Sequence, residues 1–133
     1  MRCVLDANAA IAAMNDIGAV RPRLAHLPAA EVGISIVAIA ELLFGAHKSK
    51  RRDENLERIA ALRRSVTVLP VTDAVVSLYG ERRALLESRG VAKSDFDLLI
   101  ACTALEHDAV LVTSDRGLLD RSIPQLRVED WIH

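Results

Sequence analysis

The chain has 133 residues and a net charge of −1; 51% of its residues are hydrophobic and 26% are charged. This length predicts one compact domain over residues 1–133, and the balanced charge does not by itself indicate a polyanionic partner. The longest apolar stretch, 34–43, contains polar residues and is too short to span a bilayer, so we expect no membrane association. The N-terminus lacks the features of a signal peptide, and Cys3 and Cys102 are isolated within apolar segments. We therefore expect two buried free thiols and a cytoplasmic protein.

The first predicted element is a short buried strand at Cys3–Leu5, which stops abruptly at Asp6. In an open α/β sheet, an acid at the carboxyl end of a strand points into the crevice where such folds bind ligands. We expect Asn8 to be the N-cap of the helix that follows, which continues to about Met14. A second short helix is predicted near residues 23–27.

A second buried strand is predicted at residues 32–35, followed by a helix from Ile36 to Phe44 or beyond, with Gly45 as a candidate break. This segment is apolar on almost every side, which predicts a buried helix. Glu41 lies in the middle of it. A lone carboxylate in such surroundings is costly unless it is protonated, paired or bound to metal. The alternatives are that Glu41 reaches the surface or pairs with an arginine.

A basic cluster follows this helix and consists of Lys48, Lys50, Arg51 and Arg52. Clusters of like charge usually form a solvated helical surface. The functional alternative is a rim that contacts RNA phosphates around an acidic pocket. We expect Asp53 to cap the next helix, which runs to about Arg64.

The second half of the chain continues to alternate strands with helices. The predicted strands are 66–71, 109–113 and 126–128, and the predicted helices are those capped by Thr72 and Ser94, the first ending before Gly90 and the second near His107. Trp131 is expected to pack the C-terminus against the core. Alternation of this kind predicts a three-layer α/β/α sandwich with a mostly parallel sheet of about five strands.

Two more acids lie near the ends of predicted elements. Asp97 follows Ser94 by three residues, as in a helix capping box, where the helix dipole favours an acid. Asp115 comes shortly after the strand 109–113 and repeats the placement of Asp6, although an aspartate before Gly117 is also typical of a turn. Neither structural role excludes metal binding, because both place the carboxylate near the sheet edge.

Four carboxylates in one crevice, Asp6, Glu41, Asp97 and Asp115, cannot all remain ionised without compensation. Two carboxylates ~5 Å apart repel by roughly 3 kcal/mol at an effective dielectric constant near 20. Either some are protonated or divalent cations neutralise them, and oxygen-only ligands favour Mg²⁺ or Mn²⁺ over zinc. The predicted chemistry is metal-assisted attack of water on a phosphodiester, since the sequence offers no convincing protein nucleophile.

Five motifs, in this order and spacing, resemble those of PIN domains, and most closely those of the small VapC-type toxins of prokaryotic toxin–antitoxin pairs. The motifs are Val4-Leu-Asp-Ala-Asn8, Ser35-Ile-Val-Ala-Ile-Ala-Glu-Leu-Leu-Phe-Gly45, Asp95-Phe-Asp-Leu-Leu-Ile-Ala101, Leu111-Val-Thr-Ser-Asp115 and Leu126-Arg-Val-Glu-Asp-Trp131. Each motif is weak alone, and together they cover nearly the whole chain.

This resemblance implies specific roles for the acids and their neighbours. Asp6, Glu41 and Asp97 would be the core metal-binding acids, Asp115 would be a fourth and more variable one, and Asn8 and Thr113 would support the site. Two departures from the family pattern are Ala7 and Ala38, where a hydroxyl residue is common. Both would remove hydroxyls that help to orient metal ligands.

The resemblance further implies a Mg²⁺-dependent endoribonuclease that cuts structured or translational RNA. It implies a homodimer, and inhibition by a cognate VapB-type antitoxin whose C-terminal segment lies in a groove beside the active site. An apolar surface groove would suit that partner.

Two other interpretations stay open at this stage. A response-regulator receiver also gathers acids at strand ends, but it requires paired acids after the first strand, an acceptor aspartate after the third and a lysine near the last, which this chain lacks. The second is a PIN-like module that binds RNA or protein without catalysis. The intact acids argue against it, and a cleavage assay separates the two.

Overall fold

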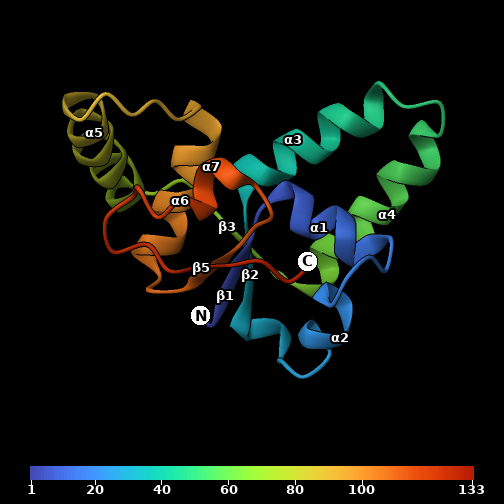
Figure 1. Ribbon diagram of the computed structural model, residues 1–133. Helices are drawn as coiled ribbons and strands as arrows, with labels where there is room; N and C mark the ends of the chain where they lie inside the picture. Colours follow the sequence, from blue (N-terminus) through green and yellow to red (C-terminus); the bar gives the residue numbers. More distant parts are fainter.

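The fold is a five-stranded sheet between two layers of helices, seen in a computed structural model of residues 1–133 (Figure 1). The strands are β1 (Cys3–Leu5), β2 (Val32–Ser35), β3 (Thr67–Leu69), β4 (Val110–Val112) and β5 (Val128–Glu129). Their order in the sheet is β3-β2-β1-β4-β5, and every neighbouring pair is parallel. The predicted three-layer sandwich of about five strands is confirmed, and the sheet is parallel throughout.

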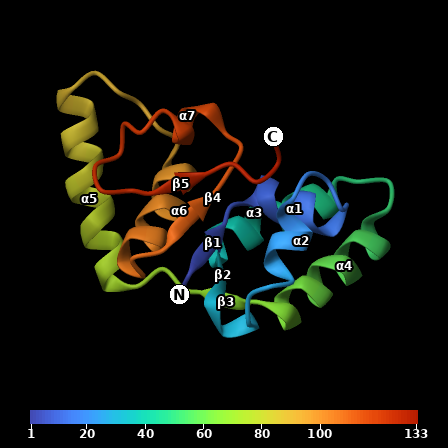
Figure 2. The same ribbon diagram turned by 60° about the horizontal axis from the view of Figure 1, so that its bottom comes forward.

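The strands are joined by helices because parallel neighbours need long crossover connections. The helices are α1 (Ala7–Met14), α2 (Val20–Leu24), the 3₁₀ turn η1 (Ala29–Glu31), α3 (Ile36–His47), α4 (Arg52–Ser65), α5 (Asp73–Ser88), α6 (Asp95–Glu106) and α7 (Arg116–Leu119). Helices α1, α2 and α4 lie on one side of the sheet, and α5 and α6 lie on the other (Figures 1 and 2). No helix is both long enough and apolar enough to cross a membrane.

Strand β1 is the centre of the sheet and of the core. It pairs with β2 on one side and β4 on the other, so that Leu5 lies between Ile34 and Val112. All of its side chains are buried, and the surrounding core is aliphatic except for Trp131. The predicted packing of Trp131 is confirmed. Cys3 and Cys102 are free and buried as expected, and burial raises the pKa of each thiol to about 11.

The chain reverses its direction of travel across the sheet at β1. It first builds outward through β2 and β3, and then places β4 and β5 on the opposite side of β1. Such a reversal leaves a crevice beyond the carboxyl ends of the two strands that flank it, β1 and β4. The backbone N–H of Asp6 donates to the Val112 carbonyl over 3.2 Å, which fixes the ends of these strands side by side.

Helix α3 is not buried on all sides, contrary to the sequence-based prediction. Its inner face is covered, but Ile36, Ala40 and Phe44 form an exposed stripe, and Phe44 is 66% exposed. The covered face of α3 packs mainly against α4, α6 and α1, which leaves the opposite face in solvent whatever its composition. The helix also continues through Gly45 to His47.

Several predicted element boundaries are wrong. The second helix begins at Val20, earlier than expected, because Pro22 fits the first helical turn, where its missing N–H costs nothing. Arg51, and not Asp53, takes the N-cap position of α4. The last strand is Val128–Glu129, which begins two residues later and ends one residue later than predicted.

Gly18 and Gly90 offer a matched test of how the chain is held together. Both have positive φ, +64° and +70°. A Cβ on Gly18 would lie 2.6 Å from the Ile132 backbone, whereas a Cβ on Gly90 would meet nothing within 4 Å.

We predict that Gly90→Ala lowers the free energy of unfolding by about 1–2 kcal/mol, from left-handed backbone strain alone. Gly18→Ala should cost clearly more, because it also displaces the C-terminal segment. Urea denaturation of both variants measures the difference. Equal losses would show that the contact of Gly18 with Ile132 contributes nothing.

Candidate active site

Asp6 occupies the N-cap position of α1, which was predicted for Asn8. Its backbone is extended (φ −84°, ψ 178°), and its Oδ1 accepts a hydrogen bond from the Ala9 backbone N–H over 2.8 Å. An aspartate directly after β1 can therefore both end the strand and begin the helix. The residue is 6% exposed, so its carboxylate is fixed in place at the crevice. Asn8 lies two positions further along, in the first turn, and is exposed.

The pKa of Asp6 is raised, chiefly because burial removes water from the carboxylate. Hydrogen bonds from the Thr113 hydroxyl and the Ala9 backbone oppose the shift, and the negative charges of Asp97 and Asp115 add to it. Two of the other predicted site residues therefore lie close enough to repel Asp6. Thr113, predicted as a supporting residue, contacts Asp6 directly.

Asp97 lies in the first turn of α6, where the Ser94 hydroxyl accepts its backbone N–H over 3.1 Å. The predicted cap at Ser94 is thus confirmed. Burial raises the pKa of Asp97, and the charge of Asp115 raises it further, whereas hydrogen bonding with Ser94 and the positive charge of Lys93 lower it. Asp97 is therefore half-buried at a helix N-terminus and faces a second carboxylate.

Asp115 is the N-cap of α7, a one-turn helix that the sequence did not reveal. Its Oδ1 accepts from the Gly117 backbone N–H over 2.8 Å, and its own N–H donates to the Thr113 hydroxyl oxygen over 3.0 Å. Asp115 therefore has the turn role that the sequence suggested, and it also lies near Asp6. Thr113 is 1% exposed and joins Asp115 to Asp6 from the end of β4.

Glu41 approaches the same place from α3. It is half-buried, and its pKa is raised first by burial and then by the charges of Asp97 and Asp6. Glu41 is not isolated in an apolar interior, because it lines a pocket at the edge of the crevice and is near Asp97 and Asp6. The four acids thus lie near one another although they come from separate segments: Glu41 and Asp97 lie in α3 and α6, and Asp6 and Asp115 cap α1 and α7.

The side chains as they stand do not form a ready-made metal site. No three His, Cys, Asp or Glu side chains are arranged to hold one ion. The donor set nevertheless fits a hard divalent cation, since it is made of carboxylate oxygens whose mutual repulsion such a cation relieves. Binding by more than two acids requires side chains to rotate. Glu41 is the freest to do so, whereas Asp6 is held by the α1 cap.

The predicted basic cluster does not contact the acids. Lys48, Lys50, Arg51 and Arg52 are all exposed where α3 turns into α4 (Figure 1). Lys48 lies over the Phe44 ring, 5.1 Å from its centroid, and Arg52 pairs with Asp53 over 3.2 Å. Lys48 is seven positions after Glu41, which places the cluster roughly 10 Å along α3 from the site.

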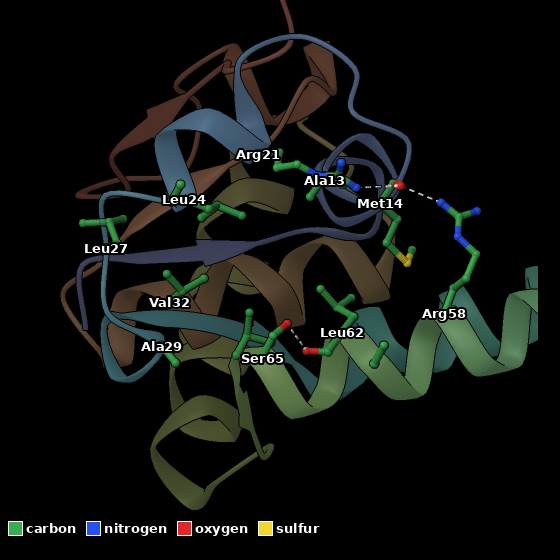
Figure 3. Close-up of a pocket in the computed structure, with 13 residues that line it drawn as sticks. Ala13, Met14, Arg21, Leu24, Leu27, Ala29, Val32, Arg58, Leu62 and Ser65 are labelled. Carbon is green, nitrogen blue, oxygen red and sulfur yellow. Dashed lines mark hydrogen bonds between the residues drawn. The ribbon is translucent and has the colours of Figure 1, made fainter.

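A groove that the sequence did not locate runs from the site across the molecule. A pocket of about 400 Å³ begins at Glu41 and Asn8 and lies between α1, α3 and α4. A second pocket of about 580 Å³, mostly apolar, continues between α1, α2 and α4 (Figure 3). Met14 and Arg58 line both, so the two pockets adjoin.

Two arginines shape the junction of these pockets (Figure 3). Arg58 donates to the Met14 carbonyl and to the Asn15 side chain, each over 2.6 Å. Arg21 donates to the Ala13 and Met14 carbonyls over 3.0 and 3.2 Å. Cations at this end of α1 satisfy its free carbonyls and favour its dipole. The arginines are therefore held as part of the groove wall.

Residues 3–123 match the PIN domain. This chain belongs to the PIN-domain family. It is 33% identical to Ribonuclease VapC2 of Rickettsia felis over 75% of this chain and 74% of that protein. It is 32% identical to the tRNA(fMet)-specific endonuclease VapC of Shigella flexneri over 98% of each.

Two solved toxin–antitoxin complexes share this PIN fold over nearly their whole VapC-like chains. The DNA-bound VapBC structure from Salmonella typhimurium has a TM-score of 0.89 at 28% identity and covers 98% of each chain. VapBC2 from Rickettsia felis, bound to a DNA fragment from its promoter, has a TM-score of 0.87 at 29% identity and covers 98% of this chain and 99% of that one. The family resemblance drawn from the motifs is therefore confirmed.

Because the pKa values of three acids in this PIN domain are raised, its stability should depend on pH. For Asp6, Glu41 and Asp97 the folded pKa exceeds the ordinary values of 3.8, 4.5 and 3.8. Above those values the folded state retains protons that the unfolded chain has released. The contribution of these three acids to the stability of the fold is therefore fully present below the ordinary pKa, and it is lost as the pH rises through the folded pKa.

We predict that Glu41→Gln is at least as stable as the parent at pH 7, because it removes this electrostatic penalty. Below pH 4.5, the ordinary value for Glu41, the difference should vanish. Urea midpoints between pH 3.5 and 8, without divalent cations, measure it, and Glu57→Gln on the exposed side of α4 controls for the lost charge. A marked loss of stability at pH 7 would instead give Glu41 a structural role.

Proposed function

We propose that this PIN-domain protein is an endoribonuclease toxin of the VapC type, which hydrolyses RNA phosphodiester bonds with water. The observation that carries the proposal is the gathering of Asp6, Glu41, Asp97 and Asp115 at the crevice beside β1 and β4, where the charge of one acid raises the pKa of another. The ribonuclease and tRNA endonuclease names of the relatives support it.

In this proposal Asp6, Glu41, Asp97 and Asp115 hold Mg²⁺, for which Mn²⁺ can substitute. A bound ion would lower the pKa of a water molecule and neutralise negative charge on the phosphate. Asp6 provides the fixed ligand because the α1 cap and the Thr113 hydroxyl hold it.

The other acids and the polar neighbours complete this site. Asp97 lies in the first turn of α6 and Asp115 caps α7, so both helix N-termini present a carboxylate to the crevice. Thr113 keeps Asp6 and Asp115 together through one hydroxyl. Asn8, exposed at the mouth of the pocket beside Glu41, is placed to contact the RNA backbone.

We further propose that the groove between α1, α2 and α4 receives a segment of a VapB-type antitoxin. Relatives of this fold have been solved as VapBC complexes, which supports such a partner. The larger pocket would take apolar side chains through Leu24, Leu27 and Leu62. The smaller pocket ends at Glu41, where a basic side chain of the antitoxin would be attracted to the acids. A homodimer is also expected for a protein of this type.

A PIN-like module that binds RNA or protein without cutting is the alternative. It would leave the acids without a chemical role, although their mutual repulsion carries an energetic cost. Cleavage that depends on the acids separates the two proposals.

We predict that the purified protein cleaves RNA in Mg²⁺ and loses this activity in EDTA. Asp6→Asn should lower the cleavage rate at least about 100-fold, because it removes the fixed ligand while an asparagine can still cap α1. Asp16→Asn, an exposed acid in a left-handed turn that asparagine tolerates, is the matched control. Mapping new RNA ends on total RNA gives both the rate and the target.

Cleavage that persists unchanged in EDTA or in Asp6→Asn would contradict the proposed mechanism. A parent protein that binds RNA but cuts none, with Mg²⁺ or Mn²⁺ present, would favour the binding module.

We predict that Lys50→Ala combined with Arg51→Ala weakens RNA binding and reduces its salt dependence. The slope of log K against log salt should fall by roughly one to two, one for each lost phosphate contact. Arg63→Ala with Arg64→Ala, an exposed basic pair at the far end of α4, is the control. Binding in a catalytically inactive Asp6→Asn background, measured over a range of salt, gives the slopes. Equal effects of the two pairs would make the basic cluster an ordinary solvated surface.

A further inference from the structure

Lys93 is a buried cation in the loop between α5 and α6, and the proposed mechanism does not use it. Its side chain is only 7% exposed, although lysine is a residue that normally reaches solvent. Its ammonium donates to the Gly117 carbonyl and, over 2.7 Å, to Oδ2 of Asp120. Both acceptors belong to the α7 turn, so Lys93 joins the start of α6 to α7.

The two segments that Lys93 joins each carry one of the site acids. Lys93 directly precedes Ser94, whose hydroxyl caps the turn that contains Asp97. On the other side, Gly117 accepts from Lys93 through its carbonyl and donates to the Asp115 carboxylate through its N–H, over 2.8 Å. A single residue therefore separates the Lys93 ammonium from the Asp115 side chain.

Helix α7 needs such an anchor because it is one turn long. A four-residue helix has no stability of its own, so its position depends on tertiary contacts. Leu118 supplies one by packing into the core, where it is 2% exposed. Asp120, the C-cap of α7, supplies another through Lys93, and this contact lowers the pKa of Asp120 to about 2. The pairing is therefore formed across the whole physiological pH range.

We propose that Lys93 is a positioning residue that fastens α7 to the start of α6 and thereby sets Asp115 beside Asp97 for metal binding. The inference rests on the proposed nuclease function, because it assigns Lys93 a role in the same site. Lys93 does not touch the substrate or the metal; it acts through Gly117 on Asp115.

The test is Mn²⁺ affinity of the RNA-free protein, measured by calorimetry. Lys93→Met should weaken binding about tenfold, the size typical of residues that orient metal ligands. The conservative Lys93→Arg should recover most of the loss, because a guanidinium can still reach the α7 carbonyl and carboxylate. Arg127→Met is the matched control: Arg127 also holds a backbone carbonyl and a carboxylate, both of Asp108, but on an exposed surface away from the acids. It should leave Mn²⁺ affinity unchanged.

A double-mutant cycle separates positioning from general destabilisation. If Lys93 acts through Asp115, Lys93→Met should have little further effect on Mn²⁺ affinity in an Asp115→Asn background. Losses that add, or a folded Lys93→Met with normal affinity, would overturn the inference. Should Lys93→Met not fold, Asp120→Asn weakens the same link from its 43% exposed side and should lower affinity in the same direction. Normal affinity in that variant would also overturn it.

The outcomes distinguish this inference from the proposed function. Mn²⁺ binding that Asp6→Asn abolishes but Lys93→Met leaves intact would refute the role of Lys93 alone. A parent protein without binding that depends on Asp6 would refute the proposed metal site, and the inference with it.

Discussion

The parallel pairing of β1 with both β2 and β4 is the constraint on which the site depends. Parallel strands end at the same edge of a sheet, so residues that follow different strands are brought together there. Asp6 follows β1 at once, and its N–H is bonded to the last residue of β4. Asp115 lies three residues beyond β4 and caps a turn over the same edge. The position of these two acids is thus a consequence of backbone pairing rather than of contacts between the side chains.

The gathered carboxylates work against the stability of the fold. Burial and mutual repulsion raise the pKa of Asp6, Glu41 and Asp97, and each such shift means that the ionised site is disfavoured. Helix capping offsets part of this energetic cost, because Asp6 and Asp115 each accept a hydrogen bond from a backbone N–H. Sites with this combination of burial and like charge are typical of chemistry that needs a cation. The same carboxylates that cap α1 and α7 are therefore the ones proposed to bind the metal.

The surroundings of the site divide into an apolar side and a charged side. The groove between α1, α2 and α4 is mainly apolar and reaches Glu41, which suits an inhibitor that buries side chains. The exposed cations at the α3–α4 turn suit a polyanion held by long-range attraction. Lys93, buried on the opposite flank beside α7, belongs to neither surface and contacts only the protein's own turn. The surfaces proposed for RNA and for the antitoxin, and the contacts of Lys93, thus lie in separate parts of one small domain.

The sequence by itself determined the fold class and the four acids. Alternating apolar strands and helices require a parallel sandwich. An acid at the end of a buried segment, such as Asp6 after Cys3–Leu5, is costly and therefore indicates a functional role. The motifs that surround these acids were specific enough to identify the PIN family. The local sequence pattern was enough to predict these features, because each of them depends on a few consecutive residues.

Only the tertiary structure decided what depends on partners distant in the chain. Asp6 rather than Asn8 caps α1 because the end of β4 fixes the backbone of Asp6. Helix α3 has an exposed stripe because only one of its faces is covered, mainly by α4, α6 and α1. The groove forms only where α1, α2 and α4 come together. The role of Lys93 depends on its contact with α7, more than twenty residues away in the sequence. Helical periodicity and capping rules describe neighbours along the chain, whereas these contacts arise when separate segments are brought side by side.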